Sequence, residues 1–227
     1  GEVLKNVSIK VGGPAGSGVK SVGAILAKTF TRYGFSVFEY PEYPSLIRGG
    51  HNTEQIVASE TEIFSQIKPV NILLAFDQKT IDEDLKEVTA NGIVIYDSKI
   101  TRRTKSNGRQ WIDLPMGEMA RNLGNGLMAN NVGVGAILAL LRLKPKITKD
   151  IISEEFKDKE LKIIEINHAA LDQGYKYLSG KEIKLNAYLK PQIKKPDQIL
   201  LTGNDAVALG AVAAGMGLYV SYPMTPS

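Results

Sequence analysis

The sequence predicts an α/β protein: a three-layer α/β/α domain on a mixed, mostly parallel sheet, followed by a linker and the beginning of another domain. Three observations lead to this class. Short apolar segments alternate with amphipathic ones along the first half of the chain. Residues 70–76 are apolar except for Asn71, as in a buried central strand. A stretch rich in proline and lysine then interrupts the pattern near residue 185.

The elements follow from these patterns in chain order. Strands are predicted at 7–11, 35–40, 54–59, 70–76 and 93–96, and the alternation around Trp111 is also typical of a strand. A helix is predicted at 19–33, with an apolar face formed by Val22, Ile25, Leu26, Thr29 and Phe30. Further helices are predicted at 77–90, where early acidic residues suit the helix dipole, and at about 115–123, 132–142, 148–156 and 160–179. Asn130 and Asn131 are predicted N-caps.

The chain divides into a complete domain at 1–183, a linker at 184–200 and the truncated start of a second domain at 201–227. The linker contains Pro191, Pro196 and four lysines and has no helical period. The last segment predicts a helix at about 204–216 and a strand at 218–221. One helix and one strand cannot bury enough surface to fold alone, so we expect this segment to dock on its own domain or on a neighbouring molecule.

Composition excludes several classes of protein. The 227 residues contain no cysteine, which excludes disulfides, cysteine-ligated zinc and iron–sulfur clusters from this chain. No apolar run is long enough to span a membrane and no signal peptide opens the sequence, so we expect a cytoplasmic location. The net charge of +4 comes from basic residues interleaved with acids, which does not favour nucleic-acid binding. His51 and His168 have no metal-ligand spacing, and no metal site is expected.

The glycine loop, Gly12–Gly18, is the first candidate for chemistry. A loop between a strand and a helix N-terminus offers backbone N–H groups and a positive dipole end, which suit a phosphate. Neither common motif fits, because Ser21 replaces the third glycine of a dinucleotide site and Val19 replaces the lysine of a P-loop. Glu39 stands where a ribose-binding acid would stand. A nicotinamide or flavin site and a purely structural tight turn both remain open.

Two other segments carry polar groups in constrained surroundings. Residues 44–52 place Arg48 between exposed backbone and His51, an arrangement that suits a phosphate, a carboxylate or a partner's carbonyl groups. Arg48 could equally bind a neighbouring acid such as Glu42. At the end of the chain, Thr225 lies between Pro223 and Pro226, and the two rings fix its hydroxyl group in space just after a predicted strand.

These segments together carry a resemblance to the 2-oxoacid:ferredoxin oxidoreductases. Residues 202–215 and the terminal Tyr222-Pro223-Met224-Thr225-Pro226 resemble the opening of the family's catalytic α region. Residues 13–18, 44–52 and 131–136 resemble its γ domain. The order, γ before α, is that of the fused γ–α subunits, and the two stretches cover nearly the whole chain.

The resemblance implies oxidative decarboxylation of a 2-oxoacid to an acyl-coenzyme A and carbon dioxide, with reduction of ferredoxin. It implies thiamine diphosphate with Mg and coenzyme A in the intact complex, and a β subunit that carries thiamine and an iron–sulfur cluster. Thr225 is the implied substrate contact, with Tyr222 and Pro223 beside the thiamine. Coenzyme A contacts are implied at Gly16, Ser17, Gly18 and Lys20, and Arg48 is an implied interface or anion-binding residue.

We expect this chain alone to be inactive and to carry no bound cofactor. Two other functions stay open from the residues themselves. One is a nucleotide-binding module, in which the glycine loop binds a pyrophosphate and Glu39 binds the ribose. The other is a non-catalytic assembly domain, in which the glycine loop is purely structural and the chain associates with a β subunit.

Overall fold

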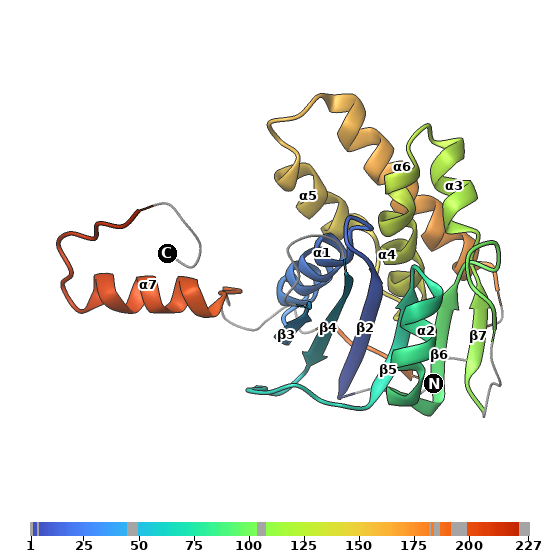
Figure 1. The fold of residues 1–227 in the computed structure, drawn as a ribbon, viewed down its shortest axis with the longest axis horizontal. Helices are drawn as coiled ribbons and strands as arrows, with labels where there is room; N and C mark the ends of the chain where they lie inside the picture. Colours follow the sequence, from blue (N-terminus) through green and yellow to red (C-terminus); the bar gives the residue numbers. More distant parts are fainter. Residues whose placement is uncertain are drawn as a thin grey trace.

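A computed structural model describes residues 2–3, 5–44, 50–103, 108–181, 183, 187–191 and 199–222. The fold is an α/β domain on a six-stranded sheet, from which the last helix, α7, extends to one side (Figure 1). The strands are β1 Glu2–Val3, β2 Asn6–Pro14, β3 Ser36–Glu42, β4 His51–Ser59, β5 Val70–Ala75, β6 Val88–Tyr96, β7 Gln110–Asp113 and β8 Ala187–Tyr188. The helices are α1 Val19–Arg32, α2 Gln78–Asp84, η1 Leu85–Glu87, α3 Met116–Asn122, η2 Gly126–Met128, α4 Ala129–Leu140, α5 Lys146–Glu155, α6 Leu161–Ser179 and α7 Gly203–Ala213.

The main sheet has the order β3-β4-β2-β5-β6-β7. Strands β2, β5, β6 and β7 run parallel to one another, whereas β4 lies antiparallel to both β2 and β3. The sheet is therefore mixed and mostly parallel, as predicted. Trp111 lies in β7, and its ring meets that of Tyr96 edge-to-face. This confirms the strand predicted around it.

Opposite faces of the sheet pack against different helices, because successive side chains of a strand point to opposite sides. On β5, Ile72 and Leu74 belong to the main core, which includes apolar residues of α1, α4 and α6. Leu73 and Ala75 face the other way, towards smaller clusters that include Leu85 and Ile81. Helices therefore cover both faces, and the three-layer prediction is confirmed.

The helix predicted at 77–90 is shorter in the structure. Asp77 is its N-cap, with Oδ1 accepting a hydrogen bond from the Thr80 backbone N–H at 2.9 Å. The helix α2 ends at Asp84, and a single 3₁₀ turn leads directly into β6. The predicted acidic first turn was wrong, since the acid that favours the helix N-terminus is the cap itself. Val88 already pairs with Val70, so sheet pairing wins over helical propensity.

Helices α4 and α6 cross at very close range. A Cβ atom on Gly174 would lie 1.9 Å from the Val132 carbonyl oxygen, and one on Gly135 would lie 2.0 Å from the Leu171 carbonyl oxygen. Asn131 lies inside α4 and donates from Nδ2 to Asn167 Oδ1 on α6. The N-cap prediction for the two asparagines was therefore wrong, because a contact between distant segments uses the Asn131 side chain.

The C-terminal part of the chain leaves the domain in two steps. Strand β8, inside the predicted linker, pairs with β1 in a small parallel sheet, and Leu189 after it is buried. The helix α7 then begins with a capping box between Thr202 and Asp205, and all its residues are exposed or half-buried. Residues 218–221 form no strand. That prediction was wrong, since a strand requires a hydrogen-bonded neighbour.

Candidate functional site

The carboxyl edge of β2 and β5 is the place where this topology favours a ligand. After β2 the chain enters α1 on one face of the sheet, and after the adjacent β5 it enters α2 on the other face. Connections that leave two neighbouring parallel strands in opposite directions open a crevice at their carboxyl ends. The glycine loop, the start of β4 and the N-terminus of α2 meet at this edge (Figure 1).

The glycine loop is partly a strand. Gly12 and Gly13 lie in β2, where side chains would collide with Thr80 and with Ser17 and Phe76. The turn proper covers residues 15–18. Its Ala15 N–H donates to the Gly50 carbonyl oxygen at 3.0 Å, and the Ser17 N–H and hydroxyl both donate to the Pro14 carbonyl oxygen. These bonds fix the loop against the start of β4.

Gly16 and Gly18 both adopt left-handed backbone conformations, with φ of 89° and 85°. Gly18 is the N-cap of α1 and lies against Asn130, whereas nothing lies within 4 Å of the place where a Gly16 side chain would begin. The backbone at Gly16 is therefore open to a ligand. The first N–H groups of α1 have no partner inside the helix, and they carry its positive dipole end.

Lys20 lies in the first turn of α1 and adds a cation to this edge. Its ammonium group stands 5.2 Å from the centre of the Tyr43 ring, at the end of β3. Lys20 thus follows directly on the turn formed by Gly16, Ser17 and Gly18, with its ammonium group near Tyr43. Backbone donors, an open glycine and one lysine are the groups that bind phosphates in proteins.

Glu39 lies elsewhere. Its carboxyl group shares a hydrogen bond with that of Glu54, on the face of the sheet that α1 covers, and both press against Gly23. Burial raises the pKa of Glu39. Burial, followed by the charge and hydrogen bond of Glu39, raises the pKa of Glu54 to about 8. The antiparallel β4 also separates β3 from β2, so Glu39 does not occupy the position of a ribose-binding acid.

A buried lysine lies on the opposite face of the sheet, the face that α2 covers. Lys10, in β2, is 2% exposed, and its ammonium group lies 2.8 Å from both Asp84 and Glu87 and 3.2 Å from Glu42. Burial alone would lower the Lys10 pKa, but the hydrogen bonds and charges of Asp84 and Glu87 raise it above its usual range. Sequence reasoning missed this network. A lysine in the middle of an otherwise apolar strand was the available signal.

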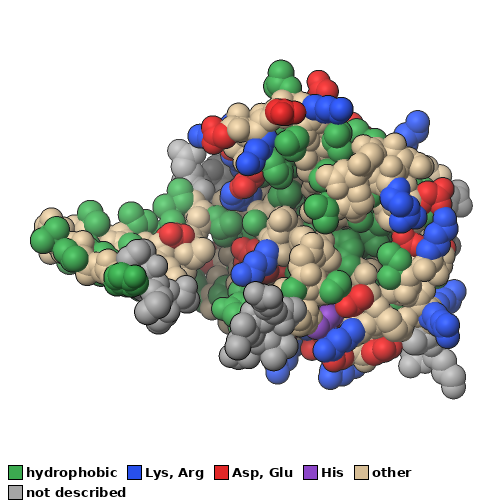
Figure 2. Space-filling model, turned by 45° about the horizontal axis from the view of Figure 1, so that its top comes forward, with side chains coloured by type: hydrophobic (Ala, Val, Ile, Leu, Met, Phe, Trp, Pro, Cys, Tyr) green, Lys and Arg blue, Asp and Glu red, His purple; other side chains and the backbone are tan. Residues whose placement is uncertain are grey.

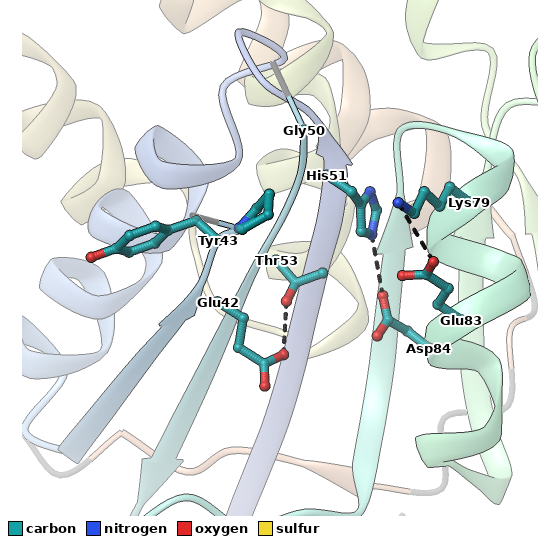
Figure 3. A pocket seen from close by; sticks show the side chains of 9 residues that line it. Glu42, Tyr43, Gly50, His51, Thr53, Lys79, Glu83 and Asp84 are labelled. Carbon is teal, nitrogen blue, oxygen red and sulfur yellow. Dashed lines mark hydrogen bonds and ion pairs between the residues drawn. The ribbon is translucent and has the colours of Figure 1, made fainter. Parts of the chain in front are cut away.

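A cavity of about 310 Å³ opens beside this network, between the end of β3, the start of β4 and α2 (Figure 3). His51 and Asp84 point towards one another in it, with Nε2 and Oδ2 3.7 Å apart. The Thr53 hydroxyl donates to Glu42 at 3.0 Å, and Lys79 pairs with Glu83 at 3.6 Å. His51, predicted only as part of segment 44–52, is therefore an interior residue of a pocket.

Other residues singled out in the sequence lie outside the described part of the chain or away from this edge. Arg48, Pro223 and Thr225 lie outside the described residues. Tyr222 is 76% exposed and follows α7, which extends away from the sheet (Figure 1). His168 packs between α5 and α6, where Nε2 lies 3.1 Å from the Ser153 hydroxyl and 3.0 Å from the Lys149 carbonyl oxygen.

Comparison with known proteins adds an independent observation. A family model described as pyruvate ferredoxin/flavodoxin oxidoreductase matches residues 8–177, the greater part of the chain. The chain belongs to this family. The matched segment includes the glycine loop, most of the chain that forms the main sheet, the residues that line the His51 pocket, and the crossing of α4 and α6.

Relatives in this family are subunits of larger enzymes. The 2-oxoacid:ferredoxin oxidoreductase 2 subunit alpha of Aeropyrum pernix is 27% identical over 99% of this chain, which spans 42% of that relative's length. The 2-oxoglutarate synthase subunit KorC of Archaeoglobus fulgidus is 30% identical over 69% of this chain and 82% of its own length.

A solved structure resembles the whole chain. It is a 2-oxoglutarate:ferredoxin oxidoreductase from Magnetococcus marinus with 2-oxoglutarate, coenzyme A and succinyl-CoA bound. The TM-score is 0.88 at 26% identity, and the match covers 98% of this chain and 40% of the other. A keto/oxoacid ferredoxin oxidoreductase gamma subunit from Geobacter sulfurreducens shares the fold over 77% of this chain, with a TM-score of 0.67 at 20% identity. Among the described residues, no helix is long and apolar enough to cross a membrane.

Proposed function

We propose that this chain is the γ domain and the first α-region residues of a fused subunit of a 2-oxoacid:ferredoxin oxidoreductase. The γ domain covers 1–183, the linker 184–200 and the start of the thiamine-binding domain 201–227. The intact enzyme converts a 2-oxoacid, coenzyme A and oxidised ferredoxin to an acyl-coenzyme A, carbon dioxide and reduced ferredoxin. The observation that carries this proposal is the match over 98% of the chain, α7 included, to a 2-oxoglutarate:ferredoxin oxidoreductase.

The exposed surface of α7 supports the assignment of the C-terminal segment. Apolar side chains of α7, and of the residues that follow it, are exposed on the projecting part of the molecule (Figure 2). They include Val207, Leu209, Val212, Leu218 and Val220. A helix that is apolar on all sides is normally buried in the core of a larger unit. We infer that the rest of the α region covers α7 and supplies the strand neighbour that residues 218–221 lack.

The glycine loop would hold the phosphates of coenzyme A. Gly16 leaves its backbone accessible, the N-terminus of α1 supplies N–H groups, and the Lys20 ammonium group supplies charge. Ser17 fixes the turn by donating to the Pro14 carbonyl oxygen, and its hydroxyl oxygen can still accept a hydrogen bond. The residues present therefore fit the group, and Arg48 is a further anion-binding or interface candidate.

The remaining assignments concern the complex. Tyr222 and Pro223 would lie beside thiamine diphosphate and its Mg, and the Thr225 hydroxyl would contact the substrate carboxylate. When bound, thiamine diphosphate supplies the carbanion chemistry that decarboxylation requires. A β subunit that carries thiamine and an iron–sulfur cluster would pass the electrons to ferredoxin. This chain would contribute packing, the coenzyme A surface and one substrate contact.

The test uses the intact complex that contains this chain, assayed by viologen reduction. Lys20→Gln removes the cation at the glycine loop, and we expect the KM for coenzyme A to rise about fivefold while the KM for the 2-oxoacid stays the same. The matched control is Lys28→Gln, two turns further along α1, where the lysine pairs with Glu155. An unchanged KM for coenzyme A in Lys20→Gln would instead favour a non-catalytic assembly domain.

A further inference from the structure

The pocket beside the Lys10 network contains buried polar atoms without partners. His51 and Asp84 are only 8% and 9% exposed, and both line the cavity. Both ring nitrogens of His51 and the Oδ2 atom of Asp84 lack hydrogen-bond partners in the part of the chain that the structure describes. Unsatisfied buried polar atoms are rare in proteins and costly, so two such side chains in one cavity indicate a site for a polar ligand.

The charges around the cavity favour a cation. Glu42, Glu83 and Asp84 line it, whereas Lys79 is the single cation among the described residues of the lining. That lysine already pairs with Glu83 at 3.6 Å, and the Lys10 ammonium group beneath is held by Asp84 Oδ1 and Glu87. The lining therefore keeps an excess of negative charge, and like charges would repel a phosphate or carboxylate.

Glu42 and Asp77 add to this excess. Partial burial would raise the Glu42 pKa, but the hydrogen bond from Thr53 and the charge of Lys10 hold it below its usual range. Glu42 therefore stays ionised. Asp77 Oδ2 lies 3.5 Å from His51 Nδ1, on the side of the imidazole ring away from Asp84. An acid thus faces each nitrogen of the ring.

The size and the ligand set point to an organic cation. Within the described ranges, no group of three or more histidine, cysteine, aspartate or glutamate side chains is arranged to hold a metal ion. A volume of about 310 Å³ equals that of roughly ten molecules of liquid water. This space admits a charged nitrogen group together with the aliphatic stem that carries it.

We propose that this pocket binds an ammonium or guanidinium group, carried either by a small free amine or by a lysine or arginine side chain of a partner polypeptide. Its N–H groups donate to Asp84 Oδ2 and to His51 Nε2. In this arrangement His51 Nδ1 faces Asp77, and Nε2 faces the ligand as well as Asp84. The ligand thereby satisfies His51 Nε2 and Asp84 Oδ2, two buried atoms that have no hydrogen-bond partner among the described residues. This site is separate from the coenzyme A surface and does not depend on it.

The two histidines of the chain provide a direct measurement. The imidazole Cε1–H signals of the whole 227-residue chain are followed by NMR at constant pH and ionic strength during titration with n-butylammonium. We expect a saturable shift of the His51 signal, while the His168 signal, in its separate site between α5 and α6, stays in place. Neutral n-butanol, which has the same stem, should leave both signals unchanged.

Matched variants test the role of charge. Glu83→Gln removes an exposed lining acid, and we expect n-butylammonium to bind about fivefold more weakly. Glu118→Gln, which removes a comparably exposed acid paired with Lys99, should bind it like the parent chain. Nα-acetyl-lysine methylamide and Nα-acetyl-arginine methylamide imitate side chains of a partner polypeptide. If either one binds more tightly than n-butylammonium, the occupant is assigned to a partner side chain.

Tighter binding of the free amine assigns the occupant to a small metabolite. The proposal is overturned if the His51 signal does not move with any cation, if n-butanol shifts it equally, or if inorganic phosphate shifts it in preference to n-butylammonium. Equal affinity of the parent chain and Glu83→Gln would also overturn it.

Discussion

The crossing of α4 and α6 gives a prediction whose size can be worked out from the structure. A Cβ atom at Gly174 would lie 1.9 Å from the Val132 carbonyl oxygen and 2.7 Å from its carbonyl carbon. Both are backbone atoms, so no side-chain rotation can relieve the collision. In Gly174→Ala the two helices must separate by about 1 Å, which opens gaps along a close-packed interface.

The expected cost follows from two opposing effects. Overpacking of a core costs about 1–3 kcal/mol, and a collision with rigid backbone belongs at the upper end of that range. Alanine favours the helix over glycine by about 1 kcal/mol, which offsets part of the cost. We therefore expect Gly174→Ala to lower the free energy of unfolding by about 2 kcal/mol. For a chain of this size, that corresponds to a fall in Tm of about 4–8 °C.

The measurement is thermal and urea unfolding of the whole chain followed by far-UV circular dichroism. Gly210→Ala is the matched control, because Gly210 also lies inside a helix but has nothing within 4 Å of its missing side chain. Its Tm should be equal to the parent's or slightly higher, because alanine favours a helix over glycine. A Gly174→Ala variant whose Tm stays within about 1 °C of the parent's would refute the close crossing.

Two further predictions concern buried charges. Lys10→Met leaves Asp84 and Glu87 without their cation and should lower the free energy of unfolding, measured in urea, by about 3 kcal/mol. The control Lys86→Met, on the exposed side of η1, should change this free energy little. Equal stability of the two variants would contradict the Lys10 network. Because the Glu54 pKa rises from 4.5 to about 8 on folding, its contribution to stability is complete below pH 4.5 and is lost as the pH rises through 8. Glu54→Gln should therefore flatten the fall in Tm between pH 5 and pH 8. A slope equal to the parent's would show that Glu54 and Glu39 do not share a proton in the folded chain.

Much of the fold was predictable because local pattern and tertiary structure agree. The largely apolar segment 70–76, predicted as a central strand, contains β5, and the five residues predicted for the inner face of α1 are all buried. The glycine loop was placed correctly after the first long strand, although Gly12 and Gly13 belong to the strand itself. In these places the period of the sequence and the packing require the same structure.

The failures have a common physical cause, which is contact between segments distant in sequence. Asparagine is a preferred N-cap residue, but the side chain of Asn131 donates to Asn167, which lies 36 residues further along the chain, in α6. Residues 218–221 have the composition of a strand, but no strand lies beside them to accept hydrogen bonds. The Lys10 network combines residues from four segments, and no local pattern could predict that β3, α2 and η1 meet at one ammonium group of β2.

The central claim is that this chain works as one part of a 2-oxoacid:ferredoxin oxidoreductase. The most direct measurement is viologen reduction by the purified complex that contains this chain, compared with the chain alone, in the presence of coenzyme A and each of several 2-oxoacids. We predict reduction that depends on a 2-oxoacid and on coenzyme A for the complex, and none for the chain alone. The proposed role would be contradicted if the complex reduced viologen with none of the 2-oxoacids tested, or if the chain alone reduced it.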